Sequence, residues 1–531
     1  PGRERWLAGG RRAAPESRRC GGAAPAGLSL RALLPALLVW TAFSAGAALA
    51  QAQRAPRYIE GAEVGQVAPR YIEGTDVQLP PSGQPSKPPA AAPSSRDELF
   101  GTKPAAGAAP ASRDELFGTS PAAATPAAAE PKPITASGFY AGTFAYTYSD
   151  PTHWSRAVNR FQFNLRGELA PSVKWTVGAR ADIDPVYMSD SFYLTAVQQD
   201  QRADFFWRET YLDFSAGDLD FRVGAQNIVW GDVVGFFVAD VVSPRDLREF
   251  LLPSFDIVRA PQWAVRAEYF KGDSHLELVW IPYPSFDNVG KAGSDFYPVR
   301  LPSPTPASVA AVFQNPVVPA RTLDNSNYGI RGNTLVAGWD LAAFYYRSFS
   351  RSPTFYTLPG GIVQPQYDRI WQAGGTANKD FGPVVLHVEG VYTGNQYYAS
   401  TDPLAPQGVL QRDTFDWVIG TDFTLPRDVR MNVQVFQRVY DGSDSTLVVQ
   451  TGDWGASAQV AAKITAAWEP QILWIQTFGG GGGLVRPRLN WYPVKNTALG
   501  FGVDIFTGAD NGFFGRYNNR DRVYGELRYD F

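Results

Sequence analysis

Apolar and polar residues alternate along the chain from about residue 134 to the end, in segments of about ten residues. In segment 160–169, Phe161 and Phe163 belong to an apolar row, while Arg160 and Asn164 belong to a polar one. A period of two places the two rows on opposite faces of a β-strand. Such segments, separated by turn residues, are typical of membrane barrels. We therefore expect residues 134–531 to form an all-β, transmembrane antiparallel β-barrel of about 16–18 strands.

A soluble β-sandwich would also have alternating strands, so the alternation is read together with two other features. The polar rows contain Arg, Asp and Glu, which suits a water-filled interior. Several segments also end in aromatic residues, as the two interfacial girdles of a membrane barrel do. These residues are Trp154, Tyr211, Trp417, Trp491, Tyr492 and Tyr529.

The last ten residues, RVYGELRYDF, have the pattern of a closing strand. Tyr529 and Phe531 lie in its apolar row, and a barrel leaves no free edge, so this strand should pair with the first. A terminal strand that ends in Phe resembles the signal by which outer-membrane barrels are recognised for assembly. We expect Tyr529 and Phe531 to act as this assembly signal, read by the barrel assembly machinery before insertion into outer-membrane lipid.

The first 50 residues have the organisation of a secretory signal peptide. An apolar core, 32–43, follows a basic stretch, and Ala48 and Ala50 occupy the small-residue positions of a cleavage site. The one cysteine, Cys20, lies in this leader, so the exported chain has no thiol for a disulfide or a metal site. No run of 18 apolar residues follows the leader, which predicts no transmembrane helix.

The charge of the exported chain argues against a nucleic-acid partner. Seven of the 48 basic residues and two of the 51 acidic residues lie in the leader, which leaves a net charge of −8. Aromatic residues make up 14% of the chain and charged residues only 19%, below the roughly 25% of an ordinary soluble domain.

Residues 51–133 are rich in Pro and Ala, and we expect them to form a disordered tail in the periplasm. The tail contains APRYIEG at 55–61 and 68–74, and SRDELFGT at 95–102 and 112–119. One interpretation is recent duplication in an unconstrained linker. The other is a pair of linear motifs that bind a periplasmic protein or an inner-membrane transporter with avidity. Their apolar anchors would be Tyr58, Ile59, Tyr71, Ile72, Leu99, Phe100, Leu116 and Phe117.

The most distinctive stretch is 205–270, which contains RETYLDF, then Gly224, Gln226 and VWG at 229–231, and then DVVSPRDLREF at 240–250. It resembles a Gram-negative outer-membrane β-barrel family, porin-like and catalogued as a domain of unknown function. This resemblance implies a role in envelope transport, in some members beside resistance-nodulation-division transporters. The two residues between Gln226 and Val229 depart from the family pattern.

The same stretch predicts a short amphipathic helix, because Ser243 can cap a helix that has Pro244 at its first position. Leu247, Phe250 and Leu251 would form its apolar stripe. We expect this segment to fold against the inner wall as a pore constriction whose charges sieve solutes. An extracellular helix, or an internal salt-bridge clasp, remains an equal alternative. The candidate charges are Asp240, Arg245, Asp246, Arg248, Glu249, Asp256 and Arg259.

Two Pro- and Ser-rich stretches, 282–327 and 348–367, are predicted to be extracellular loops. Their aromatic residues would either cap the pore and contact an apolar solute or be exposed without a function. These residues are Phe286, Phe296, Tyr297, Phe355 and Tyr356.

The sequence offers little that would support catalysis, and we expect no enzyme and no cofactor. The three histidines do not form a recognisable constellation, and we expect His275 and His387 to pair on the inner wall with Glu277 and Glu389. Turn chemistry explains DGSDS at 441–445 better than a calcium loop does.

Together these patterns predict a channel of the outer membrane. Small or elongated solutes, including apolar or aromatic ones, would pass through a lumen narrowed by an inward loop. The alternative is a non-conducting platform that belongs to an export complex and is recruited through the tail motifs.

Overall fold

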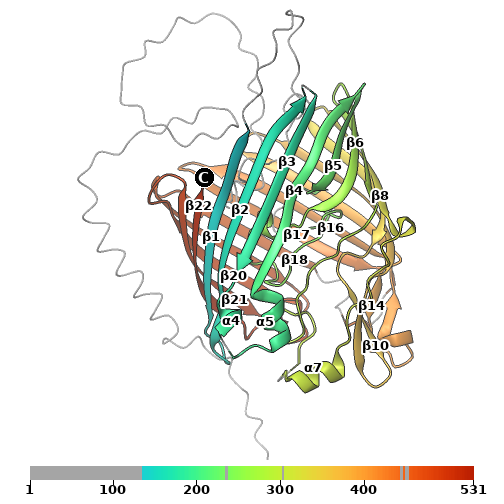
Figure 1. Ribbon diagram of the computed structural model, residues 1–531, viewed down its shortest axis with the longest axis vertical. Helices are drawn as coiled ribbons and strands as arrows, with labels where there is room; N and C mark the ends of the chain where they lie inside the picture. Colours follow the sequence, from blue (N-terminus) through green and yellow to red (C-terminus); the bar gives the residue numbers. More distant parts are fainter. Residues whose placement is uncertain are drawn as a thin grey trace, which may run out of the picture. The chain divides into compact units, whose positions relative to one another are not determined.

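A computed structural model describes residues 134–531, apart from 171, 190, 232, 234–236, 302–303, 443–445 and 449–453. The predicted leader and tail, with all eight motif anchors, lie outside the described residues. The described residues form a closed antiparallel barrel of 18 strands, which confirms the predicted fold class (Figure 1). The strands are β1 Thr135–Thr147, β2 His153–Ala170, β3 Val173–Ile183, β4 Ala203–Ala216, β5 Leu219–Gln226, β6 Gln262–Lys271, β7 Ser274–Ile281, β8 Asn327–Val336, β9 Trp339–Phe349, β12 Arg369–Asp380, β13 Val384–Gly394, β16 Thr414–Leu425, β17 Val429–Tyr440, β18 Trp454–Ala462, β19 Trp468–Thr477, β20 Gly482–Trp491, β21 Thr497–Thr507 and β22 Arg522–Asp530.

Each strand pairs with the next barrel strand along the chain, and β22 pairs with β1 to close the barrel. Short turns at one end contain glycines with positive φ, such as Gly217 and Gly272, as two-residue hairpins require. The longer connections at the other end carry the remaining elements, and Figure 1 shows several of them gathered opposite the C-terminus. These elements are α4 Val186–Ser189, α5 Thr195–Gln201, α6 Phe255–Val258, α7 Pro306–Val312, η1 Leu323–Asn325, η2 Pro406–Gly408, η3 Gly515–Tyr517 and the hairpins β10 Thr354–Leu358 with β11 Ile362–Gln366 and β14 Tyr397–Ala399 with β15 Val409–Gln411.

The distribution of side chains across the wall is the reverse of a soluble protein. Phe161 and Phe163 of β2 are exposed on the outside, whereas Arg160 and Asn164 of the same strand are buried on the inside. An apolar exterior around a polar interior is the arrangement that hydrocarbon outside and water inside would select. Among the described residues, no helix is long and apolar enough to cross a membrane.

Two residues of the predicted aromatic girdle, Trp154 and Tyr529, are exposed, as a position on the outer surface requires, and the girdle itself stays a prediction. It is wrong at Tyr211, whose ring lies 4.0 Å from the guanidinium carbon of the buried Arg222. The register between β3 and β4 shifts between Val177 and Ala179, so the alternation in β4 reverses before Tyr211.

The C-terminal residue is part of the barrel closure. Phe531 and Gly138 exchange two backbone hydrogen bonds, of 2.9 Å from Phe531 N and 2.8 Å from Gly138 N. A Cβ on Gly138 would lie 2.8 Å from the Phe531 ring, so the glycine leaves room for the aromatic side chain. Tyr529 and Phe531 therefore lie at the seam between the first and last strands.

Candidate pore constriction

The connection between β5 and β6 comprises residues 227–261 (the β5–β6 segment), and its described residues, which leave out 232 and 234–236, pack against the inside of the barrel. At its beginning, Trp230 is buried beside Phe344 and Tyr346 of β9, with ring centroids 5.1 and 5.7 Å away. Its Nε1 donates to Glu277 of β7 over 3.3 Å. Val241 and Val242 complete this apolar cluster against β6, β7, β9 and β13.

A single carboxylate of β13 holds the middle of the β5–β6 segment. Glu389 accepts a hydrogen bond from the backbone N–H of Val233 and another from that of Ala239, each of 2.8 Å. The side chain is buried, and hydrogen bonds to an ionised carboxylate are among the stronger ones in proteins. Glu389 thus ties the segment to the wall six strands away from β5.

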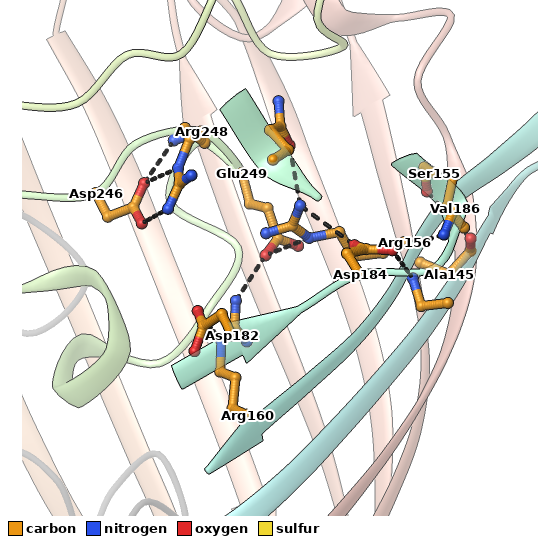
Figure 2. Close-up of polar contacts among 12 residues, drawn as sticks. Ala145, Ser155, Arg156, Arg160, Asp182, Asp184, Val186, Asp246, Arg248 and Glu249 are labelled. Atoms are coloured by element: carbon orange, nitrogen blue, oxygen red, sulfur yellow. Dashed lines mark hydrogen bonds and ion pairs between the residues drawn. The ribbon is translucent and has the colours of Figure 1, made fainter. Parts of the chain in front are cut away.

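The end of the segment reaches the part of the wall where the barrel closes. Figure 2 shows Glu249 between Arg156 and Arg160 of β2, at 3.0 and 3.1 Å, and Arg522 of β22 lies 3.4 Å away. Burial alone would raise the pKa of Glu249, but the three guanidinium groups lower it well below its ordinary value. The carboxylate is therefore ionised and shared by three arginines.

Asp246 and Arg248 form a second ionic contact beside Glu249 (Figure 2). Arg248 donates to both oxygens of Asp246, at 2.9 and 2.7 Å, and to Asp204 of β4 at 2.6 Å. Burial raises the pKa of Asp246, yet the charge and hydrogen bonds of Arg248 outweigh it and leave the pKa at about 2.

The other candidate charges also have partners. Asp256 pairs with Arg528 of β22 at 3.0 Å, and Arg259 pairs with Asp240 at 2.9 Å. Arg245 pairs with Asp287 of the β7–β8 connection at 2.5 Å. The structure therefore brings all seven predicted residues together in one segment, where each is paired. These pairs favour the salt-bridge clasp over a row of unpaired charges, and the constriction role stays a prediction.

The prediction of a helix that starts at Ser243 is wrong. Residues 243–251 form turns and isolated bridges, and the nearby helix, α6, begins only at Phe255. The backbone N–H groups of Arg245, Asp246 and Leu247 donate instead to Asp287 Oδ1, Val258 O and Asn288 O. Tertiary acceptors therefore replace the i−4 carbonyls that a helix would have supplied, which overrides the local capping signal.

Several residues that hold the segment were missed by sequence reasoning. The arginines of β2 and β22 had no motif of their own, whereas Trp230 was named only as part of VWG and Glu389 only as a partner of His387. The available signal for Glu389 was its place in the largely apolar VVLHVEGVY, because a buried acid requires a partner, but the sequence pointed to His387 and not to the β5–β6 segment.

The histidines pair with other carboxylates than those predicted. His275 lies 3.0 Å from Glu268 of β6, and His387 lies 3.0 Å from Asp422 of β16. Both partners lie on neighbouring strands, whereas Glu277 and Glu389 contact the β5–β6 segment.

The aromatic residues of the two predicted loops pack against other aromatic or polar side chains. Phe296 is buried against Phe506 and Tyr517, and Tyr297 against Phe313 and Phe355. The ring of Phe286 lies 4.1 Å from that of Tyr367, in a tilted arrangement. Tyr356 is buried and donates to Asp368. Their packing favours a structural role in the loops.

The part of the chain that the structure describes contains no group of three or more His, Cys, Asp or Glu that could hold a metal ion. The predicted turn at 441–445 is only partly described. Asp510, in the DNG turn at 510–512, accepts a hydrogen bond from Asn518 over 2.8 Å.

No protein-family model and no curated protein matches the chain, so the resemblance to a domain of unknown function stays a prediction. Solved structures of outer-membrane proteins are similar to it. OccAB4 of Acinetobacter baumannii has 8% identity and a TM-score of 0.46, and the alignment covers 76% of this chain and 99% of that one. OccK8 (OprE) of Pseudomonas aeruginosa has 10% identity, coverage of 75% and 98%, and a TM-score of 0.45. OmpF of Salmonella typhi in complex with daunomycin has 11% identity, coverage of 75% and 97%, and a TM-score of 0.40.

Proposed function

We propose that the protein is a porin-type channel of the bacterial outer membrane. One observation carries this proposal: the closed barrel has an apolar outside and a charged inside, and a single segment of the chain contacts its inner wall on several sides. A closed sheet of this kind satisfies every backbone hydrogen bond within a bilayer. The short turns and both ends of the barrel domain would face the periplasm, and the long connections would face outward.

The β5–β6 segment would narrow the lumen. Glu389 of β13 and Arg522 of β22 hold it at two separate parts of the wall. Solutes would diffuse down their gradient past the segment, with selection by the space and charge that it leaves. Small or elongated solutes, including apolar or aromatic ones, fit a lumen in which leucines and arginines lie side by side.

Liposome swelling with a panel of solutes tests this proposal. Liposomes that contain the full chain should swell faster than empty ones in small sugars and amino acids, with a cut-off as the solutes grow. Replacement of Arg245 and Arg248 by Gln should shift that cut-off or the preference for anions. Equal swelling of protein-containing and empty liposomes would contradict a channel.

A docking platform is the second candidate, and the tight packing of the segment favours it. Trp230 and Val242 are fully buried between the segment and the wall, as in a plug that does not conduct. Recruitment would then occur through the tail motifs. Deletion of residues 51–130 should abolish the capture of a specific periplasmic partner, while swelling stays at the level of empty liposomes. Unchanged capture would contradict the platform.

A further inference from the structure

A cavity of about 90 Å³ lies between the end of the β5–β6 segment and the inner wall of β19, β20 and β22. The segment contributes Leu251 and Leu252, and the wall contributes Leu473, Ile475 and Leu484. Leu484 and Ile475 are almost fully buried although they belong to the inward rows of a barrel with a polar interior. The chain therefore builds an apolar wall here, where polar residues would be expected.

The cavity has a cationic end. Leu484, Arg486 and Arg488 follow one another at every second position of β20, so all three face inward. Arg486 donates to Leu252 O over 2.9 Å and to Asp504 over 2.6 Å, which fixes it to the segment and the wall. Arg488 is more exposed, and it pairs with Glu526 at 2.8 Å. None of the described residues that line the cavity is acidic.

The surrounding wall leaves this end positively charged. Arg486, Arg488 and Arg522 face two wall carboxylates, Asp504 and Glu526. The next carboxylate, Glu249, is already shared by Arg522 with two arginines of β2. A further anion at Arg488 would therefore meet an excess of guanidinium groups, and a guanidinium fork matches a carboxylate in shape.

We propose that this cavity binds an amphiphilic carboxylic acid with a short aliphatic chain. Its chain would lie against Leu252, Leu473 and Leu484, where its methylene groups would be removed from water. Its carboxylate would accept hydrogen bonds from Arg488. The volume is smaller than that of a 150 Å³ cavity that holds benzene, so the site takes a few methylene groups and not a whole long-chain lipid. This proposal rests on the proposed channel function only in one respect, namely that the acid reaches the cavity through the lumen.

Calorimetric titration of the full chain in lipid nanodiscs tests the site, with empty nanodiscs as the blank. Sodium hexanoate should bind saturably at one site per chain. Acetate lacks the apolar chain and hexylammonium lacks the negative charge, so each should bind at least tenfold more weakly. Absence of saturable hexanoate binding, or equal binding of hexylammonium, would overturn the proposal, and this comparison needs no variant.

Variants locate the site. Arg488→Gln and Leu473→Gln should each weaken hexanoate binding at least tenfold. Arg438→Gln is the matched control, because Arg438 forms a similar cross-strand pair with Asp416 but does not line the cavity. It should leave binding unchanged. Equal losses in the Arg438 and Arg488 variants would overturn the assignment.

Conductance separates this proposal from the proposed function. A protein that binds hexanoate but shows no current in a planar bilayer keeps the site and contradicts the channel. A protein that conducts but does not bind hexanoate keeps the channel and contradicts the site.

Discussion

Glu249 Oε1 lies 3.1 Å from Nη2 of Arg160, a residue 89 positions earlier in the chain. One residue belongs to the β5–β6 segment and the other to the second strand of the wall. This contact joins the segment to the strands at which the barrel closes. In the proposed channel, the stability of the barrel and the width of its lumen would both depend on this side chain.

Glu249→Gln should destabilise the barrel by about 3 kcal/mol, because it leaves buried arginines without their shared carboxylate. Urea unfolding of the protein in detergent, followed by tryptophan fluorescence, measures this loss. Asp530→Asn is the control, since Asp530 is an exposed partner of Arg528 and should change stability by less than about 1 kcal/mol. Equal effects of the two variants would contradict the central role of Glu249.

Trp230→Ala should destabilise the folded protein by about 3 to 5 kcal/mol, because it empties a packed site between Phe344 and Tyr346. Trp263→Ala is the matched control, since Trp263 is exposed on the outside of the barrel. The same urea titration measures both variants. A smaller loss for Trp230 than for Trp263 would show that the segment is not anchored at its beginning.

Mild acidification should raise the free energy of unfolding through Asp521, which lies just before β22. Burial, with a smaller contribution from Asp504, raises the pKa of Asp521 to about 6. The folded state then takes up a proton before the unfolded state does, so stability rises as the pH falls from about 7 to about 4. After allowance for partial exposure, we expect about 1 kcal/mol, measured as a higher melting temperature.

Asp521→Asn provides the control for this pH dependence, because it removes the titrating group and should flatten this part of the profile. The contribution of Asp246 to stability changes with pH in the opposite direction. Its pKa of about 2 means that its contribution is present above the unfolded value near 4 and is lost as the pH falls through about 2. The melting temperatures of the wild-type protein and of Asp521→Asn are compared between pH 7 and pH 5. A larger decrease in the wild-type protein than in the variant would contradict the raised pKa of Asp521.

Phe531→Ala should lower the amount of assembled barrel in the outer membrane severalfold, because Phe531 closes the seam with Gly138 and belongs to the predicted assembly signal. The heat-dependent shift of the folded barrel on SDS gels measures assembly in isolated membranes. Val523→Ala changes another outward residue of β22 and serves as the control. Equal assembly of the two variants would contradict a specific role for the terminal aromatic.

The alternation of side chains was enough to predict the closed barrel, its approximate strand number and the outward position of residues such as Phe161 and Phe163. It failed at Tyr211, because β4 has one extra residue between Trp207 and Thr210 relative to β3, and this reverses the alternation before Tyr211. The charged residues of the candidate site were chosen from their density in one loop, and their role in a constriction stays a prediction. Their partners were not, because Arg160, Glu389 and Arg522 meet the segment only after the sheet has closed.

The predicted helix at Ser243 shows the same limit. Capping residues indicate only the conformation that a segment prefers by itself. The Arg245 N–H group instead donates a hydrogen bond to Asp287, which lies 42 residues later in the chain. Tertiary hydrogen bonds decided the conformation of the β5–β6 segment, and no local pattern contains them.

Single-channel recording in planar bilayers tests the central claim most directly. The full-length protein should give stable current steps, and Glu249→Gln should give larger or noisier steps because the β5–β6 segment loses its hold on the closing strands. Silence from both proteins, with folded barrels confirmed by the gel shift, would contradict a channel narrowed by this segment.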